Sequence, residues 1–140
     1  MSRAESYRHF VEARAGGSCE YCRLLQAGTG VTFHIEHVVP RSRRGRTLLG
    51  NLALSCPGCN LAKAGRLAGN DDRGRKRRLF NPREYEPWLL GWHLHFRLDR
   101  ASGVIVPRTR RGEATVSSLR MNDPVRVFAR RLQILSGLIA

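Results

Sequence analysis

Two sets of side chains in the first half of this chain have the types and spacings of metal ligands. Two cysteine pairs, each with two residues between the thiols, suit a closed tetrahedral zinc site, because both thiolates of a pair can reach one ion from a tight turn. These are Cys19, Cys22, Cys56 and Cys59. Between and after the pairs, a carboxylate, an imidazole and two amides suit a harder cation open to substrate, which indicates a hydrolytic enzyme held together by zinc. These are Glu36, His37, Asn51 and Asn60.

The cysteines have a second interpretation, as two disulfides or as a redox pair. The chain begins MSRAESYRHF without an apolar signal region, which favours a reducing compartment and a cytoplasmic protein. A redox Cys-x-x-Cys would normally occur once, beside a βαβ pattern. We therefore expect one structural Zn²⁺ on the four cysteines and keep disulfides as the alternative.

Short elements are expected to position the ligands. Residues 31–36 alternate apolar and polar side chains, which predicts a strand with His34 and Glu36 on its polar face. Residues 51–54 are a second short strand candidate, and residues 57–63 look like a turn entering a helix. The order strand, loop, strand and helix would bring the polar face of the first strand against the helix.

These residues resemble the HNH endonucleases, a family with the ββα-metal fold. The matching features are Glu36-His37-x2-Pro40, Asn51 fourteen residues after His37, Asn60 nine residues later and Lys63 three further on, framed by Cys-x2-Cys pairs. The resemblance covers about residues 19–63, and several separate spacings agree. One position departs from the family pattern, because the residue before the first motif histidine is more usually Asp than Glu.

The resemblance implies a role for each matching residue. His37 would be the general base that takes a proton from the attacking water. Glu36 and Asn60 would hold the catalytic cation, which their oxygen ligands suggest is Mg²⁺ or Mn²⁺. Asn51 would organise the loop and help to hold the catalytic histidine, and Lys63 would contact a phosphate. The implied reaction is hydrolysis of a DNA phosphodiester that leaves a 5′-phosphate and a 3′-hydroxyl.

The other histidines are placed by their neighbours. His34 shares a strand face with Glu36, so it is an auxiliary metal ligand, a phosphate contact or an orienting residue, or else it merely covers the strand. His93 and His95 alternate with apolar residues and are expected on the solvent side of a strand.

The charge of the chain is large and uneven. There are 25 Lys and Arg against 11 Asp and Glu, a formal net charge of +14, and residues 41–78 hold eleven basic residues and two acidic ones. Two basic runs, within residues 41–46 and 73–78, flank the candidate site. This position favours contact with the phosphates of DNA, which is expected to be double-stranded. The expected contacts are Arg41, Arg43, Arg44, Arg46, Lys63, Arg75, Lys76, Arg77 and Arg78.

The expected fold class is α+β, a small ββα-metal core stapled by zinc with a C-terminal β-hairpin and helices. Residues 1–80 would form the nuclease core, beginning with a helix that Ser2 and Glu5 cap, and residues 64–78 would be a polar connection. Residues 81–140 would add the extension, with no segment apolar enough to span a membrane.

The extension is expected to hold a hairpin and two helices. Residues 92–98 and 104–106 would pair, a helix would lie within 109–121, and Asp123-Pro124 would begin the last helix. The apolar stripe of that helix would be core or the surface of a homodimer, and packing on the nuclease core is preferred because a free hairpin is marginal in water. The stripe comprises Val127, Phe128, Leu132, Leu135 and Ile139.

Three functions compete. A metal-dependent DNA endonuclease is the leading interpretation, and a catalytically degenerate, zinc-dependent DNA-binding module is the second. A nuclease or binder of RNA is the third, since the chain lacks the stacking aromatics of common single-stranded RNA modules.

Overall fold

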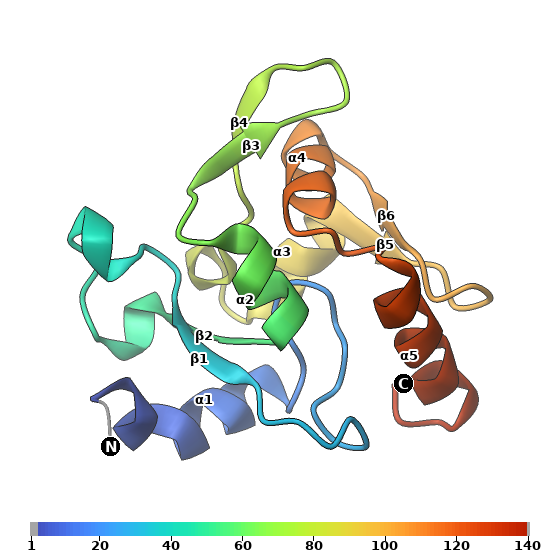
Figure 1. Cartoon of the computed structure of the whole chain (residues 1–140), viewed down its shortest axis with the longest axis horizontal. Coiled ribbons are helices and arrows are strands. Elements are labelled where there is room, and N and C mark those ends of the chain that lie inside the picture. The colour runs from blue at the N-terminus through green and yellow to red at the C-terminus, as the bar shows by residue number, and fades with distance from the viewer. Residues whose placement is uncertain (1–2, 140) are drawn as a thin grey trace.

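The computed structural model describes residues 3–139 and has mixed helical and strand structure (Figure 1). In this part of the chain, helices surround three separate two-stranded antiparallel sheets. The arrangement confirms the predicted α+β class with small sheets. None of the described helices has the length and apolar character that crossing a membrane requires.

The central unit is a two-stranded sheet followed directly by a helix. β1 (His34–His37) pairs antiparallel with β2 (Leu52–Ser55), so that His37 lies opposite Leu52. All four residues of β2 are buried. α2 (Pro57–Lys63) begins at once, because the Cys56 sulfur accepts the Cys59 N–H at the N-terminus of the helix and proline fits the first helical position. The expected order of strand, loop, strand and helix is present, with both strands shifted toward the C-terminus.

The loop that joins β1 to β2 carries two short 3-10 helices, η2 (Arg41–Arg43) and η3 (Leu49–Asn51). At the start of the described chain, η1 (Ala4–Tyr7) leads into α1 (Arg8–Ala15), and α1 contacts β2 whereas α2 contacts β1. α1 ends at Gly16, whose φ of 64° is the left-handed conformation expected of a helix-terminating glycine. The Ser2 of the expected capping box lies outside the described residues.

Residues 64–78 are more ordered than the sequence suggested, since they contain a hairpin of β3 (Ala68–Asn70) and β4 (Lys76–Arg78). The Asp71 carboxylate closes its turn by accepting the backbone N–H groups of Arg73 and Arg75 and the guanidinium of Arg77. Burial raises the pKa of Asp71, but these hydrogen bonds outweigh burial and hold it at about 2. A local carboxylate therefore turns a polar connection into a hairpin.

The hairpin expected from residues 92–98 and 104–106 is present but shorter, because residues 92–95 are helical and their prediction as strand was wrong. η4 (Pro82–Glu84) precedes α3 (Trp88–His95), and only then does β5 (Phe96–Leu98) pair with β6 (Ile105–Pro107). Trp88 and Trp92, four residues apart, are both buried on one side of the helix and donate their indole N–H groups to Arg14 and Tyr21 carbonyls. His93 and His95 therefore lie in the last turn of a helix.

The predicted pair of C-terminal helices is present, but the last helix buries a polar side and exposes most of the apolar side that was expected to be buried. α4 (Arg110–Ser118) contacts the β3–β4 hairpin, and α5 (Pro124–Leu135) follows. α5 buries Arg126, Arg130 and Gln133, whereas Phe128 is 62% exposed. Val125, Leu132 and Leu135 are exposed as well, whereas Ile139, the last member of the predicted stripe, is buried, so three of the five stripe residues do not pack on the core.

Hydrogen bonds explain this orientation of α5. The Gln133 amide donates to the Leu25 carbonyl and accepts the Leu25 N–H, and Arg130 donates to the carbonyls of Gly103 and Met121. Gln133 and the Nε and Nη2 of Arg130 thus bond fixed backbone groups, which favours their burial, whereas the Arg130 Nη1 is buried without a partner among the described residues.

Candidate metal centres and active site

The four cysteines converge on one point beside the start of α2, where Cys56 precedes the helix and Cys59 lies in its first turn. Their sulfurs all lie within 4.8 Å of one another, and the Cys22 and Cys56 sulfurs are 3.7 Å apart. A tetrahedral ion with Zn–S bonds of about 2.3 Å would hold its sulfurs about 3.8 Å apart. All four side chains are buried and none forms a disulfide. The cluster therefore fits the predicted structural zinc, with the four thiols arranged around one point rather than as two bonded pairs.

Arg126 of α5 closes the cysteine cluster from outside. Its Nη1 donates to the Cys59 sulfur at 2.9 Å, and its Nη2 donates to the Leu119 carbonyl at 2.7 Å. Burial lowers the pKa of Arg126, but the four thiols outweigh burial and raise it. Gly58 leaves room for this side chain, since a Cβ there would lie 2.9 Å from the Arg126 Nε. A guanidinium thus faces the charge that four zinc-bound thiolates would carry.

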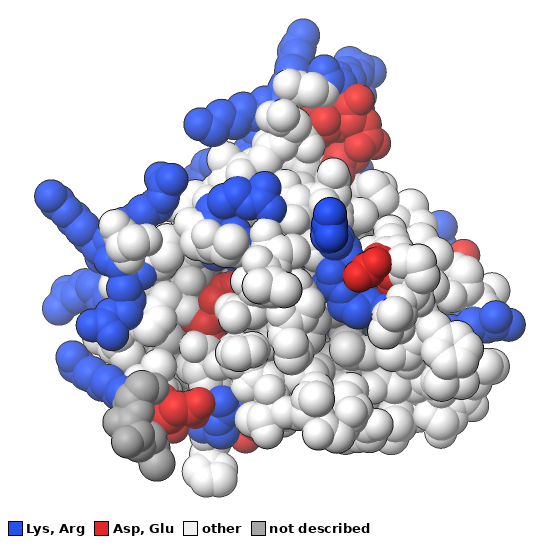
Figure 2. Space-filling view, viewed as in Figure 1, with Lys and Arg blue, Asp and Glu red and all other residues white. Residues whose placement is uncertain are grey.

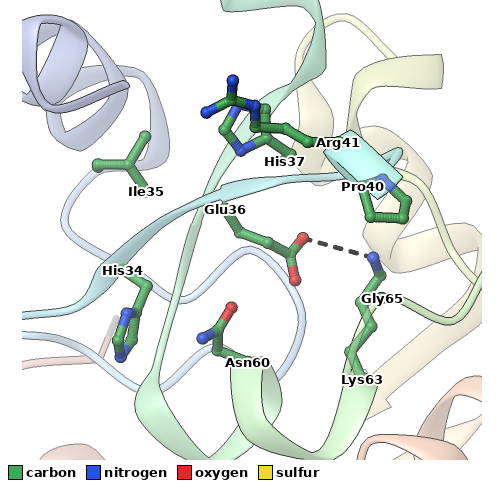
Figure 3. A pocket seen from close by; sticks show the side chains of 9 residues that line it. All are labelled: His34, Ile35, Glu36, His37, Pro40, Arg41, Asn60, Lys63 and Gly65. Atoms are coloured by element: carbon green, nitrogen blue, oxygen red, sulfur yellow. Dashed lines mark ion pairs between the residues drawn. The ribbon is translucent and has the colours of Figure 1, made fainter. Parts of the chain in front are cut away.

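A cavity of about 250 Å³ opens where the end of β1 faces α2 (Figure 3). The structure brings six of the predicted site residues together around it, three from β1, two from α2 and one from the loop between the strands. The lining residues are His34, Ile35, Glu36, His37, Pro40, Arg41, Asn60, Lys63 and Gly65. Asn51 and the hairpin cations do not line it.

Glu36 is the buried carboxylate of this cavity, only 8% exposed. Its Oε1 accepts the Tyr21 hydroxyl at 2.5 Å and lies 3.8 Å from the Lys63 Nζ. Burial raises the pKa of Glu36 to about 7, against the opposing effects of Lys63 and Tyr21. Figure 3 shows this carboxylate and the Asn60 amide projecting into the same space, with His34 on the same side of the strand. A carboxylate and an amide oxygen suit Mg²⁺ or Mn²⁺.

Lys63 is more enclosed than a phosphate-binding lysine at a surface. It is 2% exposed, and its Nζ donates to the Val38 carbonyl at 2.8 Å besides facing Glu36. Burial lowers its pKa, although Glu36 opposes this effect. In this arrangement the ammonium ties the segment after β1 to α2, and contact with a phosphate stays a prediction.

His37 lies on the other side of β1, beside Arg41 (Figure 3). Its Nε2 is 2.8 Å from the Thr47 Oγ1. Burial and then the charge of Arg41 lower the pKa of His37, which favours the neutral imidazole that a general base needs. Asn51 organises the loop, because its amide bonds both the N–H and the carbonyl of Val39.

Three residues at these sites were missed by sequence reasoning. Tyr21 lies within the Cys19-Glu20-Tyr21-Cys22 turn, where its place beside two zinc ligands was the available signal. Thr47 and Arg126 gave no signal, because their contacts with His37 and Cys59 depend on loop conformation and on the packing of α5.

The predicted DNA contacts gather on two projections of one face. Figure 2 shows Lys and Arg side chains over the loop after β1 and over the β3–β4 hairpin. Arg41, Arg43, Arg44 and Arg46 are exposed in the loop, and Arg75, Lys76 and Arg78 are exposed in the hairpin. Arg77 is partly buried against Asp71, and Arg78 also pairs with Glu84.

Comparison with known proteins agrees with this geometry. Residues 19–66 match the family model of the HNH endonucleases. No curated protein and no solved structure matched the chain. The matched segment begins at the first zinc-site cysteine and ends three residues after Lys63, and so includes every residue placed around the cavity and the cysteine cluster except Arg126. Residues 19–66 of this chain therefore form an HNH domain.

Proposed function

We propose that this protein is a metal-dependent endonuclease that hydrolyses phosphodiester bonds of double-stranded DNA. The observation that carries the proposal is the single cavity that gathers His37, Glu36, Asn60 and Lys63 within an HNH domain. Exposed cations on both sides of this cavity suit a polyanionic substrate.

Each residue has a role in this reaction. Glu36 and Asn60 would hold Mg²⁺ or Mn²⁺, with His34 as an auxiliary ligand, and the cation would neutralise the charge that develops on the phosphate oxygens. His37, held at its Nε2 by Thr47, accepts the proton of the attacking water at its other nitrogen. Lys63 holds the segment after β1 and is the nearest ammonium to Glu36. The loop and hairpin cations bind the flanking phosphates.

One observation favours the second candidate, a DNA-binding module without catalysis. The buried ammonium of Lys63 already offsets the charge of Glu36, so a cation that binds there must compete with it. Supercoiled plasmid incubated with the protein and Mg²⁺, Mn²⁺ or a chelator separates the two functions. The endonuclease nicks or linearises the plasmid only with metal, whereas the binding module retards it intact under all conditions.

We extend the proposal to a homodimer formed through the outer side of α5. This helix exposes Val125, Phe128, Leu132 and Leu135, and Figure 2 shows few charges over it, so two cationic chains could approach there. Light scattering of the parent and of Phe128→Ser tests this: a dimer that becomes a monomer supports it, and a parent monomer at high concentration refutes it. We further propose a reducing, cytoplasmic environment, in which the thiolates remain available to zinc.

A further inference from the structure

A second cavity, of about 320 Å³, lies beside the first one, between the segment after β1 and the base of the β3–β4 hairpin. Lys63 lines both cavities. Most of the other lining residues are apolar, and they are Val38, Val39, Leu67, Ala68, Leu79 and Phe80. This volume is at the lower end of the range for small-ligand sites.

The rim of the second cavity is cationic. Arg43 comes from the loop after β1, and Lys76 and Arg78 come from β4. All three are exposed, and neither Arg43 nor Lys76 forms an ion pair with an acidic residue among residues 3–139. Val38, Leu79 and Phe80 are almost fully buried and hold the base of the cavity in place, and the apolar surface open to a ligand comes mainly from the half-buried Val39, Leu67 and Ala68.

One further polar group points to a ligand with hydrogen-bonding edges. The Asn81 Oδ1 accepts the Arg83 N–H, which leaves its Nδ2 without a hydrogen bond to any described residue. An apolar floor, an amide donor and cations at the mouth together match a nucleotide. The floor suits the face of a base, the amide suits its edge, and the cations suit the phosphates on either side.

A base inside a paired duplex cannot use such a floor, because both of its faces are stacked on neighbouring bases. Phosphates and groove edges of a paired duplex would need only the cationic rim. We propose that the second cavity binds one unpaired nucleobase of the DNA strand whose scissile phosphate occupies the first cavity. This inference rests on the proposed function and adds a preference for substrates with an unpaired nucleotide near the cut.

Binding to two matched DNA duplexes tests the inference without cleavage. One duplex is fully paired, and the other has the same sequence with one extra unpaired adenine, replaced by a fluorescent adenine analogue. With His37→Ala protein and Mg²⁺, the bulged duplex should bind about tenfold more tightly, since an unpaired base leaves the stack at little cost and can then cover the apolar lining. The fluorescence of the analogue should change as it leaves the helix.

Filling the cavity is the decisive comparison. Ala68→Ile, added to His37→Ala, places a larger side chain that a strand tolerates into the cavity and should equalise the two affinities while binding to the paired duplex persists. Ala68→Val should give an intermediate ratio, and thermal melting checks that both variants fold. Ala101→Ile, the same change in the exposed turn between β5 and β6, is the control and should keep the preference.

The outcomes distinguish failure of this inference from failure of the proposed function on which it rests. Equal affinities in the His37→Ala parent, or a preference that survives Ala68→Ile, would overturn the base-binding cavity and leave the nuclease intact. No salt-sensitive binding to either duplex would overturn both.

Discussion

The cysteine cluster and the cavity between β1 and α2 are two candidate metal centres a short distance apart, built on opposite principles. The cluster offers four identical ligands, all buried, and the protein completes the coordination of its ion. The cavity offers a carboxylate and an amide from different elements to a kind of cation that takes about six oxygen ligands. A site left incomplete by the protein can be completed by water and by a phosphate, which is what a hydrolytic site requires.

The two centres are nevertheless joined by one side chain. Tyr21 lies between Cys19 and Cys22 and donates its hydroxyl to Glu36. Its neighbour Glu20 accepts the Leu54 N–H of β2 and pairs with Arg83. The turn that carries two of the candidate zinc ligands therefore also fixes the carboxylate expected to hold the catalytic cation.

The largest effect should follow loss of the cysteine cluster, the closed centre in which the protein supplies all the ligands. Cys56→Ser should abolish zinc binding and with it the folded state, because binding free energies at such sites are on the order of 10 kcal/mol, comparable to the stability of a whole domain. Elemental analysis and thermal melting measure the two losses. Unfolding of the parent by a chelator, reversed by added zinc, is the control, and a zinc-free protein that melts like the parent would contradict the prediction.

A change in the cavity between β1 and α2, the open centre, should lower the cleavage rate without unfolding the protein. His37→Ala should lower the rate of plasmid cleavage by about 10²- to 10⁴-fold, since only the proton acceptor is removed. Zinc content and melting temperature should stay at the parent values. His93→Ala, at an exposed position in the last turn of α3, is the matched control. Cleavage by His37→Ala near the parent rate would transfer the role to His34.

A third change probes the metal ligand and its connection to the zinc turn. Glu36→Gln should raise the Mg²⁺ concentration needed for cleavage or abolish cleavage, because it keeps the shape but removes the charge. Tyr21→Phe removes only the hydroxyl that holds this carboxylate and should raise the required Mg²⁺ concentration less, about tenfold or below. Glu36→Asp tests whether the longer side chain suits this backbone. Metal titrations of the cleavage rate rank the variants, and an unchanged titration of Glu36→Gln would exclude it as a ligand.

Arg126 should tune the closed centre without affecting the open one. Arg126→Met keeps a long side chain but removes the guanidinium from the thiolates, so zinc should pass to a coloured chelator several-fold faster, as expected when a partner of a metal ligand is lost. Arg131→Met, an exposed change on the same helix, should release zinc at the parent rate. Equal release from both variants would reduce Arg126 to a packing residue.

The smallest expected effect concerns the salt dependence of DNA binding. Each phosphate contact removed should flatten the log–log slope of affinity against salt by about 0.9. Replacing Arg75 and Lys76 by Ser should therefore reduce it by about 1.8 if both contact phosphates. Replacing Arg43 and Arg44 tests the loop in the same way. A slope that does not change would show that the run is only solvated.

Local patterns predicted the part of the molecule in which ligands are close in sequence. The cysteine spacings, the strand carrying Glu36 and the helix after Pro57 were all predictable, because each depends on neighbours within a few residues. The Trp88–His95 helix was not, since its sequence from Trp92 onward alternates like a strand and only the burial of Trp88 and Trp92 selects the helix.

The features that could not be predicted from the sequence depend on partners far away along the chain. The orientation of α5 depends on Gln133 meeting the backbone of Leu25, 108 residues earlier, and no pattern within the helix announces that partner. An apolar stripe on a helix predicts that something will cover it but not what. The predicted roles of Asn51 and Lys63 were tied to the family, whereas their contacts with Val39 and Val38 came only from the structure.

The charges buried at the edge of the HNH domain have a consequence for protein engineering. A fragment that ends at residue 66, where the family match ends, would keep Glu20 and Cys59 but lose Arg83 and Arg126. Uncompensated buried charge is strongly destabilising, so such a fragment is a poor donor for grafting onto another scaffold. A proposed division at residue 80 would separate the same partners. The shortest transferable unit that contains the HNH domain should extend at least to Gln133, and a designer who wants it smaller must supply substitutes for both arginines.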